Sequence, residues 1–84
     1  MPYIKLKDRE LFAADLEILG HTISHCGELN YVITKLCHSY LEKEGLCYSV
    51  LNEIIGVLEC AKQELYRRKI SPYEDIKIEE NGDV

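Results

Sequence analysis

The sequence predicts a mainly α-helical fold, a three-helix antiparallel bundle that occupies residues 1–84 as one domain. Apolar residues recur every three or four positions in three stretches, about 8–25, 28–44 and 49–69. The chain has only 84 residues, too few for a second domain. Because a domain this small buries little surface, we also expect the chains to associate into homo-oligomers.

The first expected helix covers residues 8–25. Asp8 suits its N-cap, and Gly27 suits the position just after its end. The apolar stripe consists of Phe12, Leu16, Leu19 and Ile23. Such a stripe indicates one buried face.

The second expected helix, 28–44, has the most regular pattern, and Gly45 ends it. Its apolar positions are Leu29, Val32, Ile33, Leu36, Cys37, Tyr40 and Leu41.

The third expected helix begins at Ser49 as N-cap and ends at Lys69, since Ser71-Pro72 disfavours continuation. Its apolar residues cover about half of the helix circumference, which is wider than one neighbouring helix requires. The homo-oligomer is therefore expected to form through this helix, where Gly56 and Cys60 permit close approach.

Both ends of the chain alternate polar and apolar residues, in 3–6 and 75–79. This alternation favours short extended segments, which are able to pair as two strands.

The net charge of −5 is concentrated in an acidic tail, residues 73–84, with five acidic residues against one lysine. The rest of the chain is nearly neutral and can hold a local basic patch. Duplex nucleic acid is not an expected partner, because its phosphates require a broad cationic surface. No apolar run reaches the length that spans a bilayer, so we expect no membrane partner and a cytoplasmic location.

Metal and cofactor sites are not expected. The four cysteines contain no Cys-x-x-Cys pair and are interpreted as free thiols that pack as small hydrophobic residues. His21 and His25 lie one helical turn apart before Cys26, but they lack the glutamate of a His-Glu-x-x-His motif.

Catalysis is not expected either, and no catalytic residue is assigned. Helical nucleotide hydrolases bind magnesium through acids three residues apart on facing helices. Here Glu53, Glu59 and Glu64 are six and five residues apart, so the pairs of acids three residues apart are absent from this helix. A small hydrolase remains an alternative.

The candidate ligand-binding residues surround the end of the third helix. Arg67, Arg68 and Lys69 suit either the helix dipole or an anion, and Lys62 interrupts an apolar face. Arginine binds phosphate through paired hydrogen bonds, and tyrosine stacks on a nucleobase. The expected ligand contacts are Arg67, Arg68, Tyr66, Lys62, Tyr73, Asn52, Tyr31, Asn30 and Glu59.

Several segments together resemble a family of small uncharacterised prokaryotic and phage proteins, catalogued as a domain of unknown function. They are MPYIK, GELNYVIT, LNEIIGVLECAK, YRR, PYED and ENGDV, which span almost the whole chain. The resemblance implies that most of the candidate contacts occupy family-motif positions, but it implies no reaction or cofactor. His21 and His25 fall outside the motifs.

The favoured function is a non-enzymatic binding protein. By analogy with phage proteins, we expect an anti-defence sponge that sequesters an anionic, nucleotide-derived signal in pockets between subunits, in the host cytosol. The alternative is a protein-interaction module that binds and inhibits a partner protein.

Overall fold

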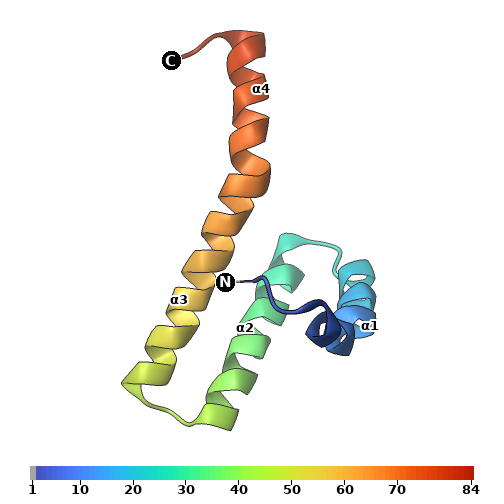
Figure 1. The fold of residues 1–84 in the computed structure, drawn as a ribbon, viewed down its shortest axis with the longest axis vertical. Coiled ribbons are helices and arrows are strands. Elements are labelled where there is room, and N and C mark those ends of the chain that lie inside the picture. Colours follow the sequence, from blue (N-terminus) through green and yellow to red (C-terminus); the bar gives the residue numbers. More distant parts are fainter. Residues whose placement is uncertain (1) are drawn as a thin grey trace.

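The computed structural model describes residues 2–84 and confirms a mainly α-helical chain (Figure 1). Its elements are α1 (Leu6–Thr22), α2 (Cys26–Glu44), α3 (Tyr48–Leu65), the π-helical turn η1 (Tyr66–Ile70) and α4 (Ser71–Asn81). No strand forms within residues 2–84, so the expected pairing of the two ends is wrong. Pro2–Lys5 lie outside any helix, at the start of the described chain.

The C-terminal segment is helical, and the prediction of an extended segment after Pro72 is wrong. Figure 1 shows α3, η1 and α4 continuing into one another as a single rod. The wide turn of η1 lets the Ser71 N–H bond to the Tyr66 carbonyl, five residues back. Pro72 falls in the first turn of α4, where its fixed φ suits a helix and the absence of an N–H is tolerated.

The start of α2 also differs from the prediction. Gly27 lies inside α2 instead of ending the preceding helix, and His25 is the N-cap. The Nδ1 atom of His25 accepts a hydrogen bond from the Glu28 N–H at 3.4 Å, and the Glu28 carboxylate accepts bonds from Ser24. These contacts satisfy free donors at the helix start, which gives His25 a capping role. The N-caps of α1 and α3 are Lys5 and Cys47, not Asp8 and Ser49.

The core lies between α2 and α3, which form an antiparallel hairpin. Gly45 ends α2 as predicted, with a φ of 93°. Tyr40 donates a hydrogen bond from its hydroxyl to Glu53 Oε2 at 3.1 Å and so ties the two helices together. Among residues 2–84, Val50 is the only buried side chain, with 8% of its surface exposed.

Two glycine substitutions should change stability in opposite directions. Gly45→Ala should lower the free energy of unfolding by about 1–2 kcal/mol, because an alanine strongly disfavours this backbone conformation. Gly20→Ala should raise it by about 0.5–1 kcal/mol, since Gly20 lies inside α1 with open space around it. Urea unfolding followed by circular dichroism measures the free energy of unfolding of both variants. If it changes in the same direction in both, the backbone conformations assigned to Gly45 and Gly20 are contradicted.

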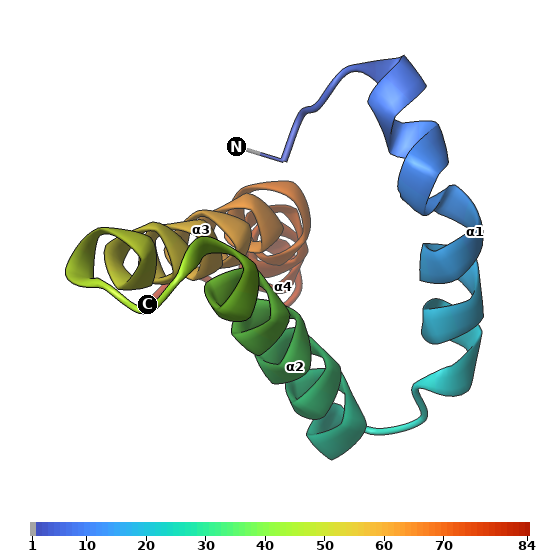
Figure 2. The same cartoon turned by 90° about the horizontal axis from the view of Figure 1, so that it is seen from below.

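Helix α1 stands apart from the hairpin (Figure 2). Within residues 2–84, no Cα of α1 lies within 8 Å of a Cα in another helix. The chain has a radius of gyration of 16.4 Å, against about 12 Å for a compact domain of this length. The single chain is therefore open and leaves most of its apolar residues exposed.

The cysteines are all free, as predicted, but Cys26, Cys47 and Cys60 are exposed, so their expected role as buried hydrophobic residues is wrong. Within residues 2–84, none of the helices combines the length and the apolar character needed to cross a membrane.

Candidate functional site

The best-defined polar site joins the N-terminal segment to the end of α3. Tyr3 donates a hydrogen bond from its hydroxyl to Glu64 Oε1, across 61 residues of sequence. Arg67 donates from Nη2 to the Tyr3 hydroxyl at 3.1 Å, and its distance to Glu64 Oε1 is 3.5 Å. Arg68 Nε lies 3.5 Å from the same carboxylate oxygen. We call Tyr3, Glu64, Arg67 and Arg68 the arginine cluster.

The π-helical turn η1 positions the arginines of the arginine cluster. A π-helical turn is wider than an α-helical turn and is frequently found at functional sites. This turn places three consecutive cations, Arg67, Arg68 and Lys69, between α3 and α4. Glu64, one turn earlier, contacts both arginines from the same side of the rod.

The electrostatics of the arginine cluster favour negative charge. Hydrogen bonding by Tyr3, together with the charges of Arg67 and Arg68, lowers the pKa of Glu64. The Tyr3 hydroxyl and Glu64 in turn raise the pKa of Arg67. One carboxylate lies beside two guanidinium groups, so the cluster keeps a net positive charge. Both arginine side chains are more than half exposed and remain accessible to an anion.

A surface hollow of about 290 Å³ lies beside the arginine cluster, lined by Cys60, Gln63, Glu64 and Arg67. Its volume is near the lower limit for small-molecule sites in proteins, and it is open to solvent. The hollow supplies a carboxylate, an amide and a guanidinium, and none of its four lining residues is aliphatic or aromatic. A ligand larger than this volume requires further walls from another chain.

The structure brings only some of the expected contacts together. Arg67 and Arg68 share the cluster, and Tyr66 is adjacent to them and half exposed. Lys62 pairs with Glu59 on the same helix, Nζ to Oε1 at 3.1 Å. That ion pair accounts for a lysine beside apolar residues without any ligand.

Four other expected contacts lie on separate elements. Tyr73 is on α4, with Lys77 Nζ 5.4 Å from its ring centre. Asn30 and Tyr31 are on α2, and Asn30 Oδ1 accepts a bond from Thr34. Asn52 is fifteen positions before Arg67 on the rod, a separation of about 22 Å at 1.5 Å per residue. Among residues 2–84, no hydrogen bond or ion pair joins any of these four residues to Arg67 or Arg68.

Sequence reasoning missed Tyr3 and Glu64. The only signal for Tyr3 was its place in the MPYIK segment, and Glu64 was considered only as a metal ligand. Residues 2–84 contain no group of three His, Cys, Asp or Glu side chains placed to hold a metal ion.

The lowered pKa of Glu64 predicts how the N-terminal segment responds to pH. Its carboxylate should stay ionised and bound to Tyr3 at pH 4.5, the ordinary midpoint, and lose this contact only at lower pH. The ¹³C NMR shift of the Glu64 carboxyl should therefore titrate below 4.5. Tyr3→Phe removes the largest contribution and should move the midpoint upward, whereas Tyr31→Phe, on α2, should not. A midpoint at or above 4.5 in the wild type would contradict the hydrogen bond.

Comparison with known proteins gives a family but no function. No curated protein and no solved structure matches the chain. The family model that matches is described as Domain of unknown function (DUF6899), and the match covers residues 1–84. The chain therefore belongs to this family.

Proposed function

We propose that this protein binds an anionic, nucleotide-derived small molecule and sequesters it without chemical change. The observation that carries the proposal is the arginine cluster, where η1 presents consecutive cations beside a tyrosine hydroxyl and an open hollow. In this proposal the protein acts in the cytosol as a phage-type anti-defence sponge.

The recognition chemistry follows from Glu64. Its carboxylate occupies the position between Tyr3, Arg67 and Arg68 that a phosphate group of the ligand would take. Each phosphate of such a ligand carries one negative charge, as a carboxylate does, and a ligand with two or more phosphates brings a larger total charge. Phosphate also accepts paired hydrogen bonds from arginine, so the ligand competes well for the two guanidinium groups. Tyr66 is half exposed on η1 and offers a flat surface for a nucleobase.

The size of the hollow supports a binding site shared between subunits. A hollow of about 290 Å³, open on one side, encloses only part of a dinucleotide. We therefore propose that a homo-oligomer formed with the participation of α3 completes the walls. Tyr31, Asn30, Asn52 and Tyr73, which are separated within one chain, have a route to the ligand only from another subunit.

Thermal unfolding with a panel of cyclic di- and trinucleotides and ADP-ribose derivatives tests the proposal. A ligand at one hundred times its Kd should stabilise the protein by about 2.7 kcal/mol, a rise in Tm of about 10–20 °C for this size. Chromatography of the ligand released by denaturation should recover it intact. Recovery of a hydrolysed product would indicate the enzyme, and no shift with any nucleotide would contradict the proposal.

The arginines provide the residue-level prediction. Arg67→Ala should weaken binding of the stabilising nucleotide about 10- to 100-fold, because it removes charge-assisted hydrogen bonds to phosphate. Lys43→Ala, an equally exposed cation at the far end of α2, is the matched control and should bind like the wild type. Isothermal titration calorimetry measures both, and equal affinities would remove the arginine cluster from the site.

A further inference from the structure

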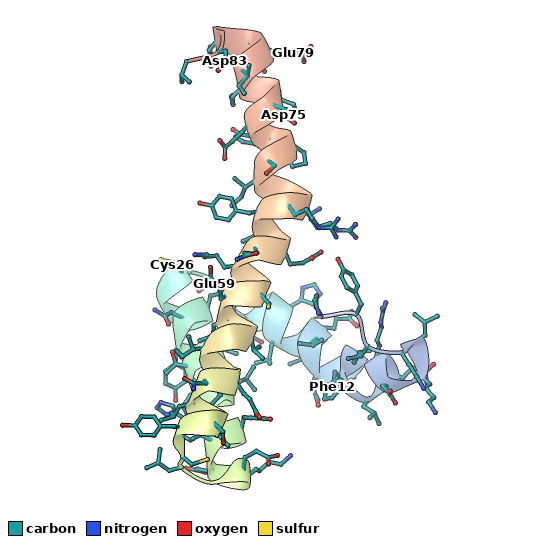
Figure 3. The ribbon with its side chains drawn as sticks, turned by 60° about the vertical axis from the view of Figure 1, so that its left-hand side comes forward. Phe12, Cys26, Glu59, Asp75, Glu79 and Asp83 are labelled. Carbon is teal, nitrogen blue, oxygen red and sulfur yellow. The ribbon has the colours of Figure 1, made fainter. Side chains whose placement is uncertain are left out.

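Helix α4 has no partner in its own chain. Within residues 2–84, the only element with Cα atoms near those of α4 is η1, which directly precedes it. Figure 3 shows Asp75 and Glu79 on α4 and Asp83 just after it, away from the α2–α3 hairpin. Tyr73 and Ile76 lie one turn apart on this helix, and each is more than half exposed. Helix α4 continues the rod beyond the hairpin, and its apolar residues gain no packing against another element of the single chain.

A groove suited to such a helix lies on the neighbouring part of the rod. It has a volume of about 370 Å³ and is lined by Pro2, Ala61, Glu64, Leu65, Arg68 and Lys69. Pro2, Ala61 and Leu65 make an apolar floor, and two cations stand at one end. We call this feature the α3 groove. The groove has an apolar floor beside two cations, and α4 carries exposed apolar residues among acidic ones. The groove and α4 are therefore complementary in polarity. They are also complementary in charge, because residues 73–84 carry a net charge of −4.

The α4 helix cannot occupy the α3 groove of its own chain, because both belong to the same continuous rod (Figure 1). The occupant must therefore come from another molecule. The exposed surface of the chain is 7691 Å², whereas a compact monomer of 9.7 kDa exposes about 5,100 Å². This excess is well above the roughly 800 Å² per partner that a standard interface buries.

We propose that the α3 groove binds the acidic helix α4 of a second copy of this chain, and that the contact is reciprocal. Two rods pack antiparallel about a twofold axis near Ser71, so that each α4 lies against the α3 groove of the other copy. Such an interface is isologous and every pair of contacts occurs twice. The binding mode is an amphipathic helix in an apolar groove.

The charges along the rod are complementary in this register. With Ser71 opposite its own equivalent, the groove residue Arg68 comes to the level of the other copy's Glu74. Beside the groove, Arg67 comes to the level of Asp75, and Lys62 to the level of Glu80. Tyr73 comes to the level of Lys69, and Ile76 to the level of Tyr66, next to the groove residue Leu65. The like-charged α4 helices point away from each other and meet only at Ser71.

Reversal of charges tests this pairing. Arg68→Glu and Glu74→Arg each place like charges in both copies of the contact, so each variant alone should associate about tenfold or more weakly than the wild type. In an equimolar mixture of the two variants, every contact between unlike chains again joins opposite charges. The mixture should recover association to within about threefold of the wild type. Both positions are exposed, so neither change disturbs the core.

The measurement combines sedimentation equilibrium at 10–100 μM with native mass spectrometry, in which one variant carries ¹⁵N. We expect the wild type to be a dimer or an even-numbered oligomer, and the mixture to consist mainly of unlike pairs. Lys43→Glu, with the same change of charge at the far end of α2, should associate like the wild type. A monomeric or odd-numbered wild type, single variants that associate normally, or a mixture no stronger than its components would each overturn the proposal. The association measurements contain no nucleotide, so their outcome does not depend on whether the protein binds a nucleotide. The two proposals can therefore fail independently.

Discussion

Replacement of Val50 by aspartate is expected to unfold the α2–α3 hairpin. Val50 is the one buried side chain among residues 2–84 and lies at the start of α3, where the two helices meet. The change removes apolar contacts and places a charged group at a buried position, at a cost of about 3 kcal/mol. In a domain this small, that loss is a large part of the total stability.

Val57→Asp is the matched control for this prediction. It makes the same chemical change two turns later on the same helix, but 65% of Val57 is exposed. Its effect on the free energy of unfolding should stay within about 1 kcal/mol. Far-ultraviolet circular dichroism during urea unfolding measures both variants. If both variants lose the same free energy of unfolding, either the core does not lie at Val50 or an assembled form of the protein buries Val57.

The helical part of the fold was predictable because its signals are local. The three-four spacing of apolar residues in 28–44 and Gly45 after it define α2 to within two residues. His25 as N-cap was not predictable with the same ease, because histidine is an uncommon cap and Gly27 suggested a helix end.

The continuation of the rod past Pro72 was the main error, and its cause is physical. Proline disfavours a helical conformation in the residue before it, yet Ser71 is helical, with φ −58° and ψ −48°. The Ser71 N–H bonds to the Tyr66 carbonyl five residues back, and this wider turn just before the proline relieves the clash between the ring and the carbonyl one turn earlier. No pattern of residue types indicates a π-helical turn reliably.

The candidate site was predictable only in part, because it depends on a contact between distant segments. Arg67 and Arg68 were identified from the local density of cations. Tyr3 reaches them across more than 60 residues, a pairing that periodicity and composition do not encode. Conversely, Asn52 was grouped with the arginines because they share a helix, although a rod separates them by about 22 Å.

Deletion of Ile70 should leave the helices intact but weaken the association of the chains. The π-helical turn holds one residue more than an α-helical turn, so the deletion should restore a regular α-helix and change the direction in which α4 leaves α3. Helical content should be retained or rise. The acidic and apolar residues of α4 would no longer face the α3 groove of a second copy, so association should fall about tenfold or more.

Ile70→Ala is the control for the deletion, because it shortens the same half-buried side chain without changing the number of residues. It should lower stability by about 1 kcal/mol and leave the oligomeric mass unchanged. Sedimentation equilibrium and circular dichroism are measured on both variants. The comparison distinguishes the effect of removing one residue from the rod from the effect of losing one side chain. If the deletion variant keeps its helical content and still associates like the wild type, the orientation that η1 gives to α4 has no part in the assembly. If only the deletion variant dissociates, the π-helical turn both presents the arginine cluster and directs α4 toward the second copy.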